Sequence, residues 1–144
     1  MEFFRNINQK VADIVATPSI NSVLILAARA CASAIFIIAG YGKITGYAGT
    51  AGYMQSMGVP AALLPLVILL ELGGGLALLA GFQVRLVALA LAVFSIASAF
   101  IFHAGADQMT QIMFMKNFAM AGGLLAFTVF GAGRLSLDAE NRQA

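Results

Sequence analysis

The stretch AALLPLVILLELGGGLALLAG, residues 61–81, carries a single charged side chain, Glu71. About 20 helical residues cross a hydrocarbon core of about 30 Å, so this stretch has the length and character of a membrane span. Three other stretches share that character, at about residues 21–42, 86–103 and 113–131. Strands are disfavoured because an isolated strand in lipid leaves backbone groups unpaired, and no alternating pattern recurs along the chain. The sequence therefore predicts an all-α membrane protein, a four-transmembrane-helix bundle at residues 21–131.

The composition agrees with this prediction. Hydrophobic residues make up 61% of the 144 residues and charged residues 10%, whereas a soluble domain usually carries about 25% charged residues. The surface must therefore be largely apolar, and the lipid bilayer is its expected surrounding. The net charge of +2 could indicate an anionic partner, but the Lys and Arg residues are scattered singly. Without a basic run that grips phosphates, nucleic acid is excluded as a partner.

The segments outside the spans have distinct characters. Residues 1–20 are expected to form an amphipathic N-terminal segment, whose apolar residues fall roughly on one side of a helix: Phe3, Phe4, Ile7, Val11, Ile14 and Val15. The glycine-rich joint at residues 43–60 is expected to hold a short interfacial helix, with tyrosines at the membrane–water boundary. The short turn at residues 82–85 makes the second and third spans a hairpin. Residues 132–144 are expected to be a mobile, polar cytoplasmic tail.

The distribution of positive charge predicts the orientation. With four spans, the two termini and the 82–85 turn lie on one side of the membrane, which then carries Arg5, Lys10, Arg85, Arg134 and Arg142. The opposite side carries Lys43 and Lys116. Because cytoplasmic segments hold the excess of Lys and Arg, both termini are expected in the cytoplasm. The N-terminal segment lacks the Arg- and Ser-rich, acid-poor character of a mitochondrial leader, so a bacterial inner (plasma) membrane is the expected location.

Two charged residues lie well inside the predicted spans, away from their ends. Arg29 is about two turns into the first span and Glu71 is near the middle of the second, and each alone costs several kcal/mol in hydrocarbon. Their similar depths, and the small residues beside both, predict an intramembrane ion pair inside the bundle. Intramembrane charge is also the usual mark of a functional site. A structural pair and a proton or substrate site both remain open.

A second polar cluster is expected at the non-cytoplasmic end of the bundle. Its candidate ligand-binding residues come from the ends of three spans: Tyr41, Lys43, His103, Lys116 and Asn117. Histidine titrates near neutral pH and can pass protons, and a lysine can bind an anion or the carbonyl of a quinone ring. The alternative is structural, because a lysine near a helix end reaches for lipid headgroups and a histidine at a helix end is ordinary.

Several chemistries are excluded by the residues that the chain lacks. Cys31 is the only cysteine, so dithiol chemistry within the monomer is not possible. The chain has one histidine and no second metal ligand at usable spacing, so no metal site is expected. No nucleotide-binding glycine motif follows a strand, and His103 lies too close to a span end to suit a haem. No intrinsic cofactor is predicted.

Five motifs, in this order along the chain, resemble the DoxX family of small bacterial membrane proteins. They are FIIAGYGKITGYAGTAGYMQSMGVP (36–60), LLELGGGLALLAGFQVR (69–85), FIFHAG (100–105), MKNFAMAGGLL (115–125) and GAGRLSLD (131–138). The resemblance implies a four-helix inner-membrane protein. It also implies a link to redox chemistry, because relatives include the small subunit of a thiosulfate:quinone oxidoreductase and others tied to oxidative or thiol stress.

Two functions of different classes follow. The first is a non-autonomous membrane subunit of a quinone- or thiol/sulfur-linked redox system, which binds a small molecule such as a quinone and works with a redox partner protein that holds the cofactor. The second is a non-enzymatic membrane scaffold, assembly factor or small-solute carrier. Neither makes the chain a self-sufficient enzyme. The Ala- and Gly-lined outer surfaces leave both a monomer and a homo-oligomer open.

Overall fold

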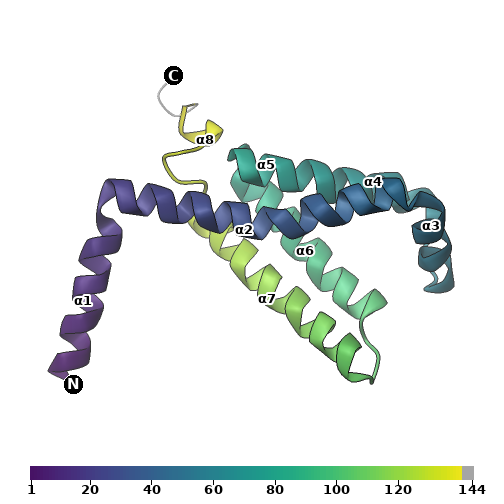
Figure 1. Ribbon diagram of the computed structural model, residues 1–144, viewed down its shortest axis with the longest axis horizontal. Helices are drawn as coiled ribbons and strands as arrows, with labels where there is room; N and C mark the ends of the chain where they lie inside the picture. Colours follow the sequence, from purple (N-terminus) through teal and green to yellow (C-terminus); the bar gives the residue numbers. More distant parts are fainter. Residues whose placement is uncertain (141–144) are drawn as a thin grey trace.

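The computed structural model describes residues 1–140, and within them every regular element is helical. The first elements are α1 (Glu2–Ala16), α2 (Pro18–Thr45) and α3 (Tyr47–Ser56). The next span is built from four consecutive pieces: the 3₁₀ turn η1 (Ala61–Leu63), α4 (Leu64–Ile68), the π-helical turn η2 (Leu69–Gly73) and α5 (Gly74–Ala80). They are followed by α6 (Val84–Phe102), α7 (Gln108–Phe130) and the short α8 (Leu137–Glu140) (Figure 1).

Four helical stretches are long and apolar enough to cross a membrane: Pro18–Thr45, Ala61–Ala80, Val84–Phe102 and Gln108–Phe130. The predicted all-α fold with four spanning helices is confirmed. The largest difference in helix bounds is at the start of α7, which was expected near residue 113. The Asp107 carboxylate accepts a hydrogen bond from the Thr110 backbone N–H at 3.0 Å, and this cap starts the helix at Gln108.

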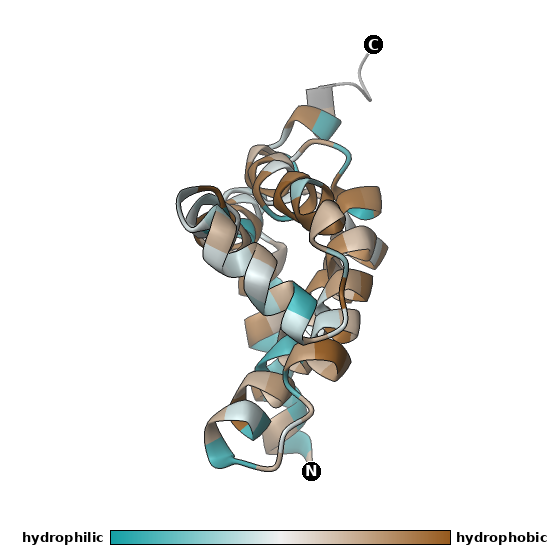
Figure 2. Ribbon diagram, turned by 90° about the vertical axis from the view of Figure 1, so that its right-hand side faces the viewer, coloured by the Kyte–Doolittle hydropathy of each residue, from teal (hydrophilic) through white to brown (hydrophobic). Residues whose placement is uncertain are grey.

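The spans form two antiparallel pairs that cross each other. α2 lies along α4, η2 and α5, while α6 and α7 form a hairpin that runs diagonally past them (Figure 1). The spanning helices are mostly brown, or hydrophobic, in Figure 2, and large apolar side chains such as Leu66, Leu69 and Phe130 are exposed on them. In water such a surface would be unfavourable, whereas in a bilayer it faces lipid tails.

Two glycines fix how α2 packs on the second span. A Cβ added at Gly40 would lie 2.7 Å from the backbone nitrogen of Leu72, and one added at Gly75 would lie 2.9 Å from Ile37. Both distances are too short for any side chain, so only glycine permits these approaches. Close backbone packing through small residues is how helices associate in lipid, where no hydrophobic drive acts between them. The register therefore places Gly40 beside Leu72 and Ile37 beside Gly75.

The N-terminal helix α1 turns away from the spans (Figure 1). None of its residues is buried, and the apolar side of the helix carries exposed Phe3, Phe4 and Val11. Thr17 is extended before Pro18, as the residue preceding a proline prefers, and this breaks the helix between α1 and α2. An exposed amphipathic helix of this kind is suited to lying in the membrane interface.

Residues 132–139 differ from the expected mobile tail. They fold back along the ends of α2, α5 and α6, and the Asp138 backbone N–H donates to the Gly81 carbonyl at 2.9 Å. Residues 141–144, including Arg142, lie outside the described residues. We call the turn at residues 81–85, together with residues 131–139, the C-terminal end of the bundle. The opposite end carries Lys43 and His103.

We expect Gly40→Ala to destabilise the protein, because the added methyl group meets the Leu72 backbone. Forced overpacking of this kind costs about 1–3 kcal/mol. Gly42→Ala is the matched control, since it lies on the same helix with nothing within 4 Å of its added Cβ. It should be neutral or stabilise by up to about 1 kcal/mol through helix propensity. Unfolding of the purified proteins in mixed micelles measures both, and equal effects of the two substitutions would contradict the register.

Candidate functional site

Glu71 lies in a local distortion of the second span. Residues Leu69–Gly73 form the π-helical turn η2, and the Glu71 side chain at its centre is only 7% exposed. A single π turn inside an α-helix inserts an extra residue, and such turns occur frequently at functional sites. Leu72, the next residue, is the one that Gly40 of α2 approaches. The carboxylate is therefore held inside the protein against α2.

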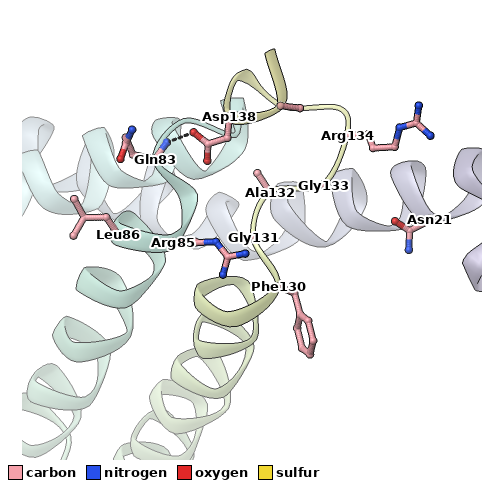
Figure 3. Close-up of a pocket in the computed structure, with 11 residues that line it drawn as sticks. Asn21, Gln83, Arg85, Leu86, Phe130, Gly131, Ala132, Gly133, Arg134 and Asp138 are labelled. Carbon is pink, nitrogen blue, oxygen red and sulfur yellow. Dashed lines mark hydrogen bonds between the residues drawn. The ribbon is translucent and has the colours of Figure 1, made fainter. Parts of the chain in front are cut away.

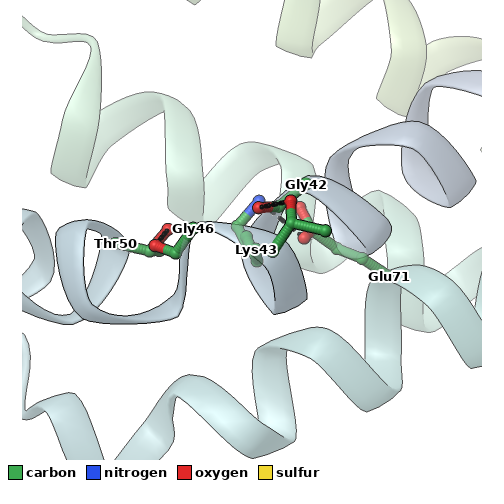
Figure 4. A network of polar contacts seen from close by, with 6 residues as sticks. Gly42, Lys43, Gly46, Thr50 and Glu71 are labelled. Carbon is green, nitrogen blue, oxygen red and sulfur yellow. Dashed lines mark hydrogen bonds and ion pairs between the residues drawn. The ribbon is translucent and has the colours of Figure 1, made fainter.

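Lys43 neutralises this carboxylate. The Lys43 Nζ lies 2.6 Å from Glu71 Oε2, and the lysine side chain is 25% exposed (Figure 4). An unpaired charge in hydrocarbon costs several kcal/mol, and a close counter-charge removes much of that cost. Lys43 occupies the last turn of α2, where a cation also interacts favourably with the helix dipole.

The predicted Arg29–Glu71 pair is wrong, since Glu71 pairs with Lys43. The glycine-fixed register places Arg29 beside Gly81, where a Cβ on Gly81 would overlap Arg29 Nη1. Glu71 precedes Gly81 by ten residues, or about 15 Å along a helix. The prediction compared depths within each span separately, but α2 extends past the end of α5. Residues at equal distances from the ends of their own spans therefore do not lie at the same level of the bundle.

Arg29 is instead buried beneath the C-terminal residues. Its side chain is 1% exposed, and Nη2 donates a hydrogen bond to the Leu135 carbonyl at 2.5 Å. Within residues 1–140, its Nε and Nη1 have no hydrogen-bond partner. Gly81 has a φ of +77°, a conformation that favours glycine, and its missing side chain leaves room for the guanidinium.

The polar groups at the C-terminal end act mainly on the backbone. The Asp138 carboxylate accepts hydrogen bonds from the backbone N–H groups of Gln83 and Val84 at 2.7 and 2.9 Å, which caps the start of α6. Arg85 donates to the carbonyls of Thr128 and Val129 at the end of α7. Gln83, Arg85 and Asp138 border a pocket of about 620 Å³. In this pocket Arg85 points toward Gly131, whereas Arg134 points away (Figure 3). The two arginines therefore do not converge on a common ligand position.

The opposite end holds a smaller cavity, of about 370 Å³, between α3, the start of the second span and α6. We call it the outer cavity. Its polar side chains are Lys43, Thr50, Ser98 and His103, and the rest of its wall is mostly apolar. Its apolar and aromatic lining consists of Tyr53, Met54, Val59, Leu63, Val67, Phe94, Ala97, Ile101 and Phe102. A mostly apolar cavity with a few convergent polar groups is the usual form of a small-molecule site.

Of the five predicted ligand-binding residues, two line the outer cavity and three lie elsewhere. Lys43 and His103 line the outer cavity together. Tyr41 is 63% exposed on α2, and Lys116 lies on an apolar groove between α2 and α7. Asn117 is buried and donates to the Met113 carbonyl of its own helix at 3.1 Å. Thr50 and Ser98 were missed, because their hydroxyls gave no signal in an apolar sequence.

His103 ends α6 at the border of the outer cavity. Burial lowers the pKa of His103 below its ordinary value, and the positive charge of Lys116 lowers it further. The imidazole is therefore mostly neutral at pH 7, with one nitrogen that donates a hydrogen bond and one that accepts. Within residues 1–140, no group of three His, Cys, Asp or Glu side chains could hold a metal ion.

Comparison with known proteins agrees with this architecture. The model of the DoxX family matches residues 24–104. Inner membrane protein YqjF of Escherichia coli K12 is 51% identical over 120 residues, which cover 83% of this chain and 92% of that protein. Inner membrane protein YphA of the same organism is 34% identical over 124 residues, covering 81% of this chain and 89% of that protein. No solved structure matches the chain significantly.

We expect Lys43→Met to destabilise the protein by about 3 kcal/mol, because it leaves a buried carboxylate without its counter-charge. Adding Glu71→Gln should restore part of this stability, since the double variant holds no unpaired charge. Arg29→Met combined with Glu71→Gln should show no such recovery, because Arg29 lies at the C-terminal end. Unfolding in mixed micelles tests the three combinations. If stability recovered in the double variant with Arg29→Met and not in the one with Lys43→Met, the observed pairing would be contradicted.

Proposed function

The chain belongs to the DoxX family, and its relatives YqjF and YphA are named inner membrane proteins. We propose that it is a membrane subunit of a redox system. In this proposal the outer cavity binds a small carbonyl compound of the quinone type. The observation that supports it is the meeting of Lys43 and His103 in one mostly apolar cavity. A quinone enters such a site from the lipid, in which it is dissolved.

The chemistry of the cavity suits a quinone ring. The ring presents two carbonyl acceptors on a flat, apolar body, and the Lys43 ammonium and a His103 N–H are donors that can meet those carbonyls. Phe94, Phe102 and Tyr53 supply aromatic surface for the ring. The volume of about 370 Å³ lies within the range of small-molecule sites.

The proposed subunit depends on a partner for its electrons. One cysteine and one histidine give the chain few of the ligands that iron–sulfur clusters and haem take. A partner protein that holds the cofactor therefore exchanges electrons with the bound quinone. Lys43 and His103 orient the ring and hydrogen-bond to its oxygens, where negative charge develops when the ring is reduced.

Quinone binding tests the proposal directly. Calorimetric titration of the chain in lipid nanodiscs with decylubiquinone should give saturable binding. His103→Ala, which removes a donor, and Ala97→Phe, which fills the cavity, should each weaken the affinity by about tenfold or more, as loss of about 1.4 kcal/mol requires.

Two controls lie outside the cavity. Tyr41→Ala and Lys10→Met should leave the affinity within about twofold of the original, because neither side chain lines the cavity. Absence of binding by the unmodified chain would reject the quinone site and favour the alternative of a non-enzymatic scaffold, assembly factor or small-solute carrier.

We further propose that both termini lie in the cytoplasm, so that the outer cavity opens toward the periplasm. Ala106→Cys, between α6 and α7, and Gln83→Cys, in the turn at the C-terminal end, place single thiols on opposite sides in a Cys31→Ala background. A membrane-impermeant thiol reagent added to intact spheroplasts should label position 106 and not position 83. The reverse pattern would overturn the orientation.

A further inference from the structure

Lys43 takes part in two arrangements at once, because its ammonium neutralises Glu71 while its side chain lines the outer cavity. We propose that binding of a carbonyl ligand in this cavity is coupled to the uptake of one proton by Glu71. The inference rests on the proposed function and adds to it a proton acceptor inside the membrane.

The Glu71 carboxylate is neutralised by one positive charge, that of Lys43. Four elements pack against η2, namely α2, α4, α5 and α6. α4 and α5 contain no ionisable side chain, and the only one on α6 is Arg85, in its first turn at the C-terminal end. The other ionisable side chains of α2 are Arg29, at the C-terminal end, and the exposed Cys31 and Tyr41. No second cation within residues 1–140 contacts Glu71 to replace Lys43.

The ligand and Glu71 therefore compete for the same ammonium. When Lys43 donates to a ligand carbonyl, its contact with the carboxylate weakens, and a buried carboxylate without a counter-charge is strongly unfavourable in hydrocarbon. Protonation removes that charge and leaves a neutral carboxylic acid. The π turn at Glu71 is consistent with a functional role for this side chain, because such turns occur frequently at functional sites.

The proton step balances simply. A proton from water at the mouth of the cavity bonds to a Glu71 oxygen, the Lys43 ammonium keeps its three protons, and no electrons move. His103 lines the same cavity as Lys43, and its imidazole can accept a proton on one nitrogen and release one from the other. The buried site thus gains one positive charge on binding.

The pH dependence of affinity tests this inference. Uptake of one proton on binding lowers the association constant of decylubiquinone about tenfold for each pH unit, over the range in which free Glu71 is ionised. Calorimetry between about pH 6 and about pH 9, in the same nanodiscs, measures that slope. Glu71→Gln should bind more tightly than the original chain at the alkaline end, and its affinity should not vary with pH in this way.

The outcomes separate the inference from the proposed function. Binding by the unmodified chain without pH dependence, or an unchanged slope in Glu71→Gln, overturns the proton uptake by Glu71 and leaves the quinone site standing. No binding at any pH overturns both.

A second measurement does not depend on the Glu71→Gln protein and therefore guards against poor folding of that variant. Infrared difference spectra of the unmodified chain, with and without decylubiquinone, should show the appearance of one protonated carboxylic acid and the loss of one carboxylate. Asp13→Asn, which removes an exposed carboxylate on α1, should leave that signal in place. A spectrum without a new carboxylic acid band would overturn the inference.

Discussion

A carboxylate within a membrane-spanning helix needs a positive charge close by, and much of this structure serves that requirement at Glu71. The π turn η2 places the side chain toward α2, and Gly40 lets the backbone of α2 come against Leu72. Only this close approach brings the last turn of α2, with Lys43, to the carboxylate. The distance of 2.6 Å between the charges is thus a consequence of a glycine three residues before the lysine.

Arg29, at the other end of the bundle, is also a buried charge that needs polar partners. Its partners differ from those of Glu71. No acidic side chain forms a salt bridge with Arg29 within residues 1–139; the Leu135 carbonyl accepts one of its hydrogen bonds, and Asp138 lies near enough to act on its charge. Residues 131–139 thereby cover the guanidinium and cap α6. A segment that is polar in sequence is here part of the folded bundle, because burying an arginine and starting a helix both demand polar partners.

The sequence was sufficient for the four spans, because length and hydropathy determine them, and it identified all the charged residues within them. It did not provide the contacts between helices. Depth along each span placed Lys43 and His103 at one end, and they share a cavity. Depth cannot give the rotation of α7, which turns Lys116 toward α2 and Asn117 onto its own backbone. The Lys43–Glu71 pair depends on register, which Gly40 and Gly75 determine only once their neighbours are known.

The position of the ion pair bears on whether it is only structural. Replacing a buried ion pair by apolar residues is often neutral or stabilising, so stability alone gives little reason to keep a carboxylate at position 71. A purely structural pair would also be expected to lie in closed packing, whereas Lys43 borders a mostly apolar cavity that His103 also lines. In the proposed function the lysine turns between the carboxylate and a ligand, and the last turn of α2 places it against Glu71 and at the outer cavity. Both features support the proposal that a ligand uses this lysine.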